Sequence, residues 1–203
     1  MCPCARSLLA TLASLLPVGC TSAHSSVAFP TARDGTAGAS HRSGDTAIEG
    51  RAYYGVPILQ KSLLWDGNGE TDDAGLGVHV LQHLADDFAI GMGLNVGNWF
   101  IGGADAQSGE IEGLMRLHPF ENLPFFFDLS AGYQLATEPV PPGGTDWNFT
   151  FAFGPGVEFP VDRGCSLELG ALYHHVSNAL GRMNDRNPSQ NEGRFWIGFV
   201  WTL

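Results

Sequence analysis

The C-terminal segment alternates between large apolar residues and small or polar ones, with a period of two. Its apolar positions all share one parity: Phe195, Ile197, Phe199, Trp201 and Leu203. Because successive side chains of a β-strand point to opposite faces of the sheet, the pattern predicts a strand with one entirely apolar face. A soluble sandwich can contain such a strand, but a face that is large and apolar up to the chain end is typical of outer-membrane barrels.

Four further segments show the same alternation, with one large apolar face and one small or polar face. Their apolar positions include Phe88 to Leu94, Ile111 to Leu117, Phe125 to Tyr133 and Trp147 to Phe159. The opposite face carries mostly Gly, Ala, Ser and Asn with a few charges, whereas the outside of a soluble barrel is usually rich in Lys and Glu. A small polar face suits the cramped interior of a small membrane barrel.

The spacing of these segments predicts about eight strands. They are expected near 51–59, 75–83, 87–97, 108–118, 124–134, 147–159, 165–177 and 192–203. The connections between them alternate long and short, and an even strand number places both chain ends on the periplasmic side. The expected fold is therefore all-β: an eight-stranded antiparallel up-and-down outer-membrane β-barrel over residues 51–203, located in the bacterial cell outer membrane.

Charge and hydropathy exclude two classes of protein. The chain has 21 acidic and 10 basic residues, a net charge of −11, without any Lys/Arg cluster. Nucleic acid is therefore excluded as a partner, because its phosphates require basic side chains. No apolar run reaches the roughly 18 to 20 residues of a spanning helix, which excludes helical membrane proteins.

The N-terminal region is predicted to be an export signal followed by a linker. Residues 1–23 carry Arg6, an apolar stretch over 8–16 and then small residues, as in a signal peptide. Cleavage before an acylated Cys20 would make it a lipoprotein signal, although Pro17 matches that motif poorly, and Thr21 to Ala23 suit an ordinary signal peptidase. Residues 24–50 read as a flexible linker of small polar residues. Only Cys165 lies in the barrel region, so a disulfide framework is not expected.

A short motif near the C-terminus carries a family resemblance. His175, Ser177, Asn178 and Ala179 are followed by Asn187-Pro188 and then by the terminal apolar strand. This arrangement resembles the lipid A 3-O-deacylase (PagL) family, closely over about the last thirty residues and more loosely through most of the barrel. The resemblance implies an eight-stranded outer-membrane barrel that acts as a serine esterase, a hydrolase removing an ester-linked acyl chain from the lipid A of lipopolysaccharide.

The resemblance also implies a role for each motif residue. Ser177 would be the nucleophile and His175 its general base, while Asn178 and Asn187 would donate to the oxyanion. The family has a glutamate four residues after the Asn of Asn-Pro, and here that position is Asn191. An Asn can orient the imidazole but brings no negative charge to stabilise the imidazolium. Glu192 could substitute if the strand entrance were bulged. The mechanism requires no cofactor, and no metal is expected.

Strand parity predicts where these side chains lie. His175 and Ser177 share a parity with the lipid-facing Leu167 and Leu169, and Asn191 shares one with Phe195. All three should therefore lie outside the barrel near its extracellular rim, at the level of the lipid A acyl esters. Glu192 should point into the lumen.

Structural interpretations compete with the catalytic one. A polar girdle at the barrel rim would explain His175 and Ser177, and turn capping would explain Asn178 and Asn187. His79 and His83 fit a strand better than a zinc-binding helix, and Asp72, Asp73, Asp86 and Asp87 are expected to be solvated loop carboxylates. The rival functions are a non-catalytic outer-membrane barrel that binds or anchors lipid and a soluble periplasmic barrel for a small apolar ligand. Whether the barrel forms a homodimer is left open.

Overall fold

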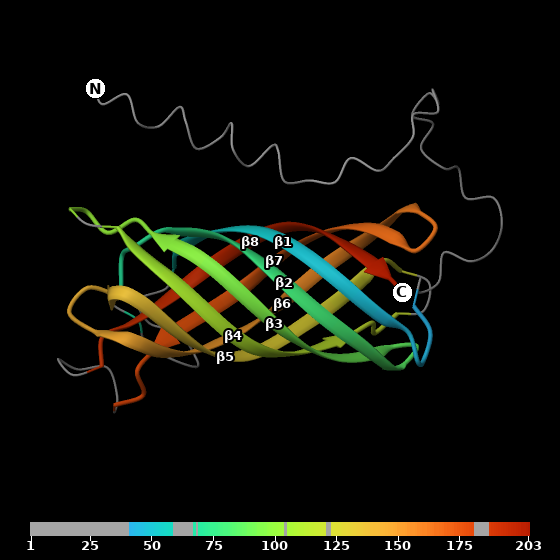
Figure 1. Ribbon diagram of the computed structural model, residues 1–203, viewed down its shortest axis with the longest axis horizontal. Coiled ribbons are helices and arrows are strands. Elements are labelled where there is room, and N and C mark those ends of the chain that lie inside the picture. The colour runs from blue at the N-terminus through green and yellow to red at the C-terminus, as the bar shows by residue number, and fades with distance from the viewer. Residues whose placement is uncertain (1–40, 59–66, 68, 104, 121–122, 181–186) are drawn as a thin grey trace, which may run out of the picture. The chain divides into compact units, whose positions relative to one another are not determined.

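The computed structural model describes residues 41–58, 67, 69–103, 105–120, 123–180 and 187–203. These residues form a closed antiparallel barrel in which each strand pairs with the next and β8 pairs with β1 (Figure 1). The strands are β1 (Thr46–Pro57), β2 (Asp73–Ala85), β3 (Phe88–Trp99), β4 (Ala106–Leu117), β5 (Phe125–Val140), β6 (Thr145–Asp162), β7 (Cys165–Ser177) and β8 (Ser189–Thr202). The predicted all-β, eight-stranded fold is confirmed.

Large apolar side chains cover the outside of the barrel. Those exposed on the outer face include Val78, Val80, Met92, Leu94, Ile111, Phe149, Phe195 and Ile197. An apolar exterior around a polar interior is the arrangement of an outer-membrane barrel, so the protein belongs in the outer membrane and the soluble-barrel alternative fails. Within the described residues, no helix is long and apolar enough to cross a bilayer.

Two regions differ most from the sequence-based expectation. β1 begins at Thr46 rather than near Arg51. The start of the strand resembles a linker in sequence, because Glu49 is a polar residue that faces the lumen. The expected long loop 135–146 is mostly strand, since β5 and β6 extend to a turn over 141–144. The predicted signal peptide, Cys20 and the linker up to residue 40 lie outside the described residues.

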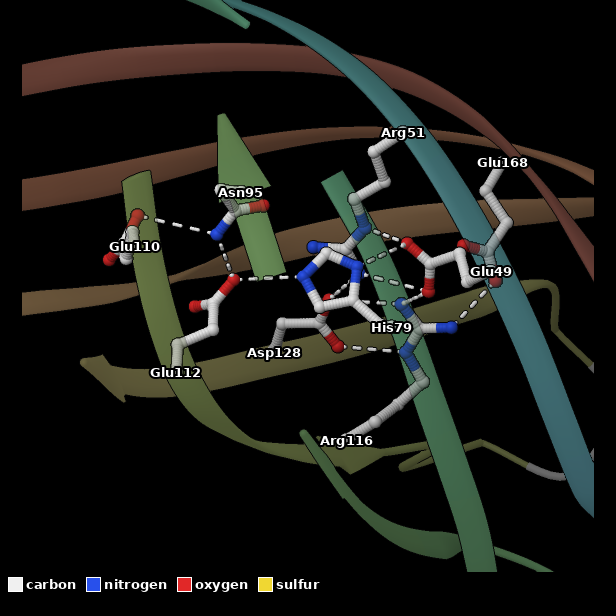
Figure 2. Close-up of polar contacts among 9 residues, drawn as sticks. All are labelled: Glu49, Arg51, His79, Asn95, Glu110, Glu112, Arg116, Asp128 and Glu168. Atoms are coloured by element: carbon white, nitrogen blue, oxygen red, sulfur yellow. Dashed lines mark hydrogen bonds and ion pairs between the residues drawn. The ribbon is translucent and has the colours of Figure 1, made fainter. Parts of the chain in front are cut away.

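A network of buried charges fills the lumen. The Arg116 guanidinium lies 2.8 Å from Asp128, 2.9 Å from Glu49 and 2.6 Å from Glu168 (Figure 2). The Arg51 side chain contacts the same Glu49 and lies 2.6 Å from Asp128. These opposite charges lie next to one another in a region that water reaches poorly.

The network continues toward the extracellular end and corrects one expectation. Asp73, expected to be a solvated loop residue, is the first residue of β2, fully buried, with its carboxylate 2.9 Å from Arg194. The cavity between Arg51, His79 and Arg194 measures about 20 Å³, which is room for about one water molecule. The lumen is therefore a packed polar core rather than a pore.

Three histidine rings pack together at the periplasmic end of the lumen. His41 stacks on His83 with ring centroids 4.3 Å apart, and His118 lies 5.9 Å from His41. The Nε2 atom of His41 lies 3.2 Å from the Glu158 carboxylate. Residues before β1 thus form part of the barrel, which extends the ordered unit beyond the predicted start.

Candidate active site at the extracellular rim

The motif residues lie where β7 and β8 end at the extracellular side. His175 pairs directly with Asn191, and Ser177 pairs with Ser189. On the other side of β7, Ser177 pairs with Phe149, which is 50% exposed on the outer face. Directly paired residues of antiparallel strands share a face of the sheet. His175, Ser177 and Asn191 therefore lie on the outside of the barrel, as strand parity predicts.

His175 and Asn191 form a hydrogen-bonded pair. The Nδ1 atom of His175 lies 2.7 Å from Oδ1 of Asn191. An amide oxygen only accepts hydrogen bonds, so Nδ1 must carry the proton. In the neutral ring this leaves Nε2 as the acceptor, which is the tautomer that a general base for a serine requires.

A third side chain, which the sequence analysis did not assign to the site, reaches the same oxygen. The hydroxyl of Tyr173 donates a hydrogen bond to Asn191 Oδ1 at 2.7 Å. Tyr173 lies diagonally across from Asn191 in the β7–β8 ladder, a separation that an aromatic side chain can bridge. Tyr173 has the same parity as the lipid-facing Leu167 and Leu169, but only the strand register reveals this contact.

The pair is shielded although it faces outward. His175 is 5% exposed and Asn191 is 1% exposed. Gly67 packs so closely on Asn191 that a Cβ atom at Gly67 would lie 2.7 Å from the backbone nitrogen of Asn191. The backbone of Ile58 also donates to the Asn191 carbonyl oxygen at 2.8 Å. Ile58 and Gly67 therefore pack against the part of β8 that carries Asn191.

Ser177 lies two residues beyond His175 on the same face and is half-buried. Among the described residues, the structure has no hydrogen bond between the Ser177 hydroxyl and the imidazole of His175. Catalytic serine–histidine contacts are often long without substrate and tighten when it binds. The placement of the two groups on one face of β7 is compatible with proton transfer between them.

Asn178 and Asn187 contact each other in the connection after β7. The backbone N–H of Asn178 donates to Oδ1 of Asn187 at 3.2 Å, and Leu180 N–H donates to Oδ1 of Asn178 at 3.0 Å. Both amide oxygens therefore accept from the backbone, which is the turn-stabilising role that the alternative interpretation expected. Only the side-chain nitrogens of Asn178 and Asn187 could donate hydrogen bonds to an oxyanion.

Glu192 does not replace the missing glutamate. It points into the lumen, where its carboxylate lies 2.8 Å from Nδ1 of His174 and 3.3 Å from Arg194. The β7–β8 register runs without a shift through this region, so no bulge turns Glu192 outward. The side chains of the adjacent residues His174 and His175 accordingly point to opposite faces of β7.

In the part of the chain that the structure describes, no group of three or more His, Cys, Asp or Glu side chains is arranged to hold a metal ion. His79 lies in β2 and binds Glu112 with its Nε2 atom at 2.8 Å. The predicted strand assignment of His79 and His83 is confirmed.

Comparison with known proteins supports the fold. No protein-family model matches the chain, and no curated protein matches it. The structure is similar to that of Neisserial surface protein A, with a TM-score of 0.55 and 14% identity over 78% of this chain and 97% of that one. It also matches the outer membrane protein OprG from Pseudomonas aeruginosa, with a TM-score of 0.49 and 14% identity over 80% of this chain and 97% of the other. At this identity the likeness to the Neisserial protein extends to the fold alone.

Proposed function

We propose that this outer-membrane barrel is a serine esterase that removes an ester-linked acyl chain from lipid A, as the resemblance to lipid A 3-O-deacylases implies. The observation that carries the proposal is the His175–Asn191 pair on the outside of the barrel, with Ser177 beside it. The carboxylic-ester hydrolase activity would use these three side chains and no cofactor.

The location of the pair favours a lipid substrate. The outer face of a membrane barrel is apolar where it meets acyl chains, yet the extracellular end of β7 and β8 carries an imidazole, a hydroxyl and an amide. Lipopolysaccharide occupies the outer leaflet, and its acyl esters lie at the boundary between sugar and hydrocarbon. A reactive group at the extracellular rim therefore meets this bond without extracting the lipid from the membrane.

The proposed reaction has two steps. Ser177 Oγ attacks the ester carbonyl carbon while Nε2 of His175 takes its proton, and the tetrahedral intermediate then expels the sugar oxygen, which receives that proton. In the second step water attacks the acyl-serine, again with His175 as base, and the fatty acid leaves. Ser177 and His175 end in their starting states, so the cycle is closed.

Asn191 and the two loop amides would support these steps in different ways. Asn191 holds His175 in the tautomer with a basic Nε2. The side-chain nitrogens of Asn178 and Asn187 are candidates to donate to the oxyanion. Since Asn191 lacks the charge of a glutamate, it stabilises the imidazolium less, and a slower reaction is expected than with a carboxylate at this position.

A non-catalytic barrel that binds or anchors outer-membrane lipid is the second candidate function. The neutral Asn191 favours it, because a lost carboxylate is one route to an inactive enzyme. A channel is disfavoured by the packed lumen, in which the buried Arg116 contacts three carboxylates (Figure 2).

The test is hydrolysis of lipopolysaccharide by the purified barrel in detergent, followed by mass spectrometry of the released fatty acids. We expect release by the wild type and none above background by Ser177→Ala. Ser43→Ala is the matched control, because Ser43 is exposed at the periplasmic end. Folded wild-type protein that releases no fatty acid, while still binding lipopolysaccharide, would favour the non-catalytic barrel.

A further inference from the structure

The side chain of Asn191 poses an orientation problem that a glutamate does not have. A carboxylate presents two equivalent acceptor oxygens, whereas an amide has an acceptor oxygen on one side and a donor nitrogen on the other. If the amide of Asn191 were flipped, its nitrogen would face Nδ1 of His175. Nδ1 would then have to accept, the ring proton would move to Nε2, and the imidazole could no longer take a proton from Ser177.

The hydroxyl of Tyr173 favours the orientation in which the amide oxygen faces His175. This hydroxyl lies 2.7 Å from Asn191 Oδ1, the same oxygen that lies 2.7 Å from His175 Nδ1. The oxygen thus accepts from two donors on β7, one on its direct partner and one on the diagonal neighbour. A flipped amide would place its nitrogen between these two groups, and the phenol oxygen, which is a better donor than acceptor, would then have to accept from it.

The ring of Tyr173 is itself held in place by packing. Its centroid lies 5.2 Å from that of Phe153, the residue directly paired with it on β6. On the other side of the amide, Gly67 leaves Asn191 little room, since a Cβ atom there would lie 3.0 Å from Nδ2. The hydroxyl therefore approaches Asn191 from a fixed direction.

We propose that Tyr173 is a positioning residue that fixes the side-chain amide of Asn191 and, through it, the basic tautomer of His175. The inference rests on the proposed esterase function, because the tautomer affects turnover only if His175 is the base. The proposal adds the Tyr173 hydroxyl to the site, in contact with the amide of Asn191 that stands where the resembled family has a carboxylate.

The test is a double-mutant comparison of Tyr173→Phe in two backgrounds, wild type and Asn191→Glu. Phenylalanine keeps the ring and removes only the hydroxyl. In the wild-type background we expect kcat for fatty-acid release from lipopolysaccharide to fall roughly tenfold with KM unchanged, about the effect of losing one neutral hydrogen bond. In the Asn191→Glu background we expect less than about a twofold change, because a carboxylate needs no orienting donor.

A control variant and a second readout separate positioning from a merely structural role. Tyr133→Phe removes a hydroxyl from the outer face of β5 and should leave kcat unchanged. An equal loss from Tyr173→Phe in both backgrounds would mean that the hydroxyl supports the barrel and not the amide, and would overturn the inference.

The second readout is the ¹⁵N NMR spectrum of histidine-labelled protein, with the His175 signals identified by their loss in His175→Gln. We expect the Nδ1-protonated tautomer in the wild type and a mixture of tautomers in Tyr173→Phe. If the wild type released no fatty acid but showed this tautomer change, the esterase proposal would fail and the positioning role would stand. Identical tautomer populations in both proteins would overturn the positioning role whatever the activity.

Discussion

The side-chain oxygen of Asn191 lies 2.7 Å from Nδ1 of His175, across a β7–β8 register that pairs these two residues directly. The pair is nearly inaccessible to water although it belongs to the lipid-facing side of the barrel. Polar side chains in this environment must find hydrogen-bond partners, because an unpaired polar group would face hydrocarbon. The contact therefore fixes both the ring orientation and the position of its proton.

Replacing Asn191 with Leu should remove the acceptor for His175 while keeping a similar volume. We expect kcat to fall by roughly 10²- to 10⁴-fold with KM nearly unchanged, since the imidazole would lose its defined tautomer. Initial rates of fatty-acid release from lipopolysaccharide measure this, with heat-modifiable electrophoretic mobility as the check on folding. A folded variant within threefold of the wild-type rate would show that Asn191 does not orient His175.

Gly67→Ala should disturb the same side chain from the outside. The added Cβ would lie 2.7 Å from the Asn191 backbone nitrogen and 3.0 Å from its Cγ, so Asn191 would have to shift. We expect roughly a tenfold lower kcat, because small displacements of catalytic groups are costly. Gly109→Ala is the control, because nothing lies within 4 Å of a Cβ there. Equal rates in both variants would argue against close packing of Gly67 on the site.

Arg116→Leu should destabilise the barrel by about 3–5 kcal/mol. Arg116 is the shared partner of Glu49, Asp128 and Glu168, and its removal leaves the buried Glu168 uncompensated and leaves Glu49 and Asp128 to share Arg51. Urea unfolding in lipid vesicles, followed by tryptophan fluorescence, gives the free energy of unfolding. Arg163→Gln, in the exposed turn between β6 and β7, should change it by less than about 1 kcal/mol. Similar losses in the two variants would contradict the role assigned to the lumen network.

Acidification should weaken the periplasmic end of the barrel. Burial, and then the positive charge of Arg116, lowers the pKa of His118 from 6.5 to about 4. The unfolded chain therefore binds more protons than the folded one between these values, so the His118 contribution is complete above pH 6.5 and is lost as the pH falls toward 4. We expect the wild type to lose more unfolding free energy over this interval than His118→Gln. Parallel pH profiles for the two proteins would show that His118 is not buried neutral.

Much of the fold follows from the sequence because one physical rule governs every strand. The alternation of apolar and polar residues predicted β7 at its observed bounds, 165–177, and predicted the start of β8 to within three residues of its observed position. The same parity placed His175, Ser177 and Asn191 on one face and Glu192 on the other. These relations depend only on the two-residue period of a strand.

Other features depend on the register and closure of the barrel and could not be predicted from the sequence. Thr46 to Gly50 carry a lumen-facing glutamate and resemble a linker until β8 is known to pair with them. Asp73 resembles a loop carboxylate until Arg194 is found beside it. The contact between Tyr173 and Asn191 is diagonal, so it requires the exact alignment of two strands and not their parity alone.

The central claim is that Ser177 attacks an acyl ester of lipid A. Mass spectrometry of lipid A from Gram-negative cells that express the wild type or Ser177→Ala tests it in the native membrane. We predict that the wild type removes one acyl chain and that lipid A from cells with the variant keeps its full mass. Unchanged lipid A in both strains, with both barrels folded in the outer membrane, would contradict the account.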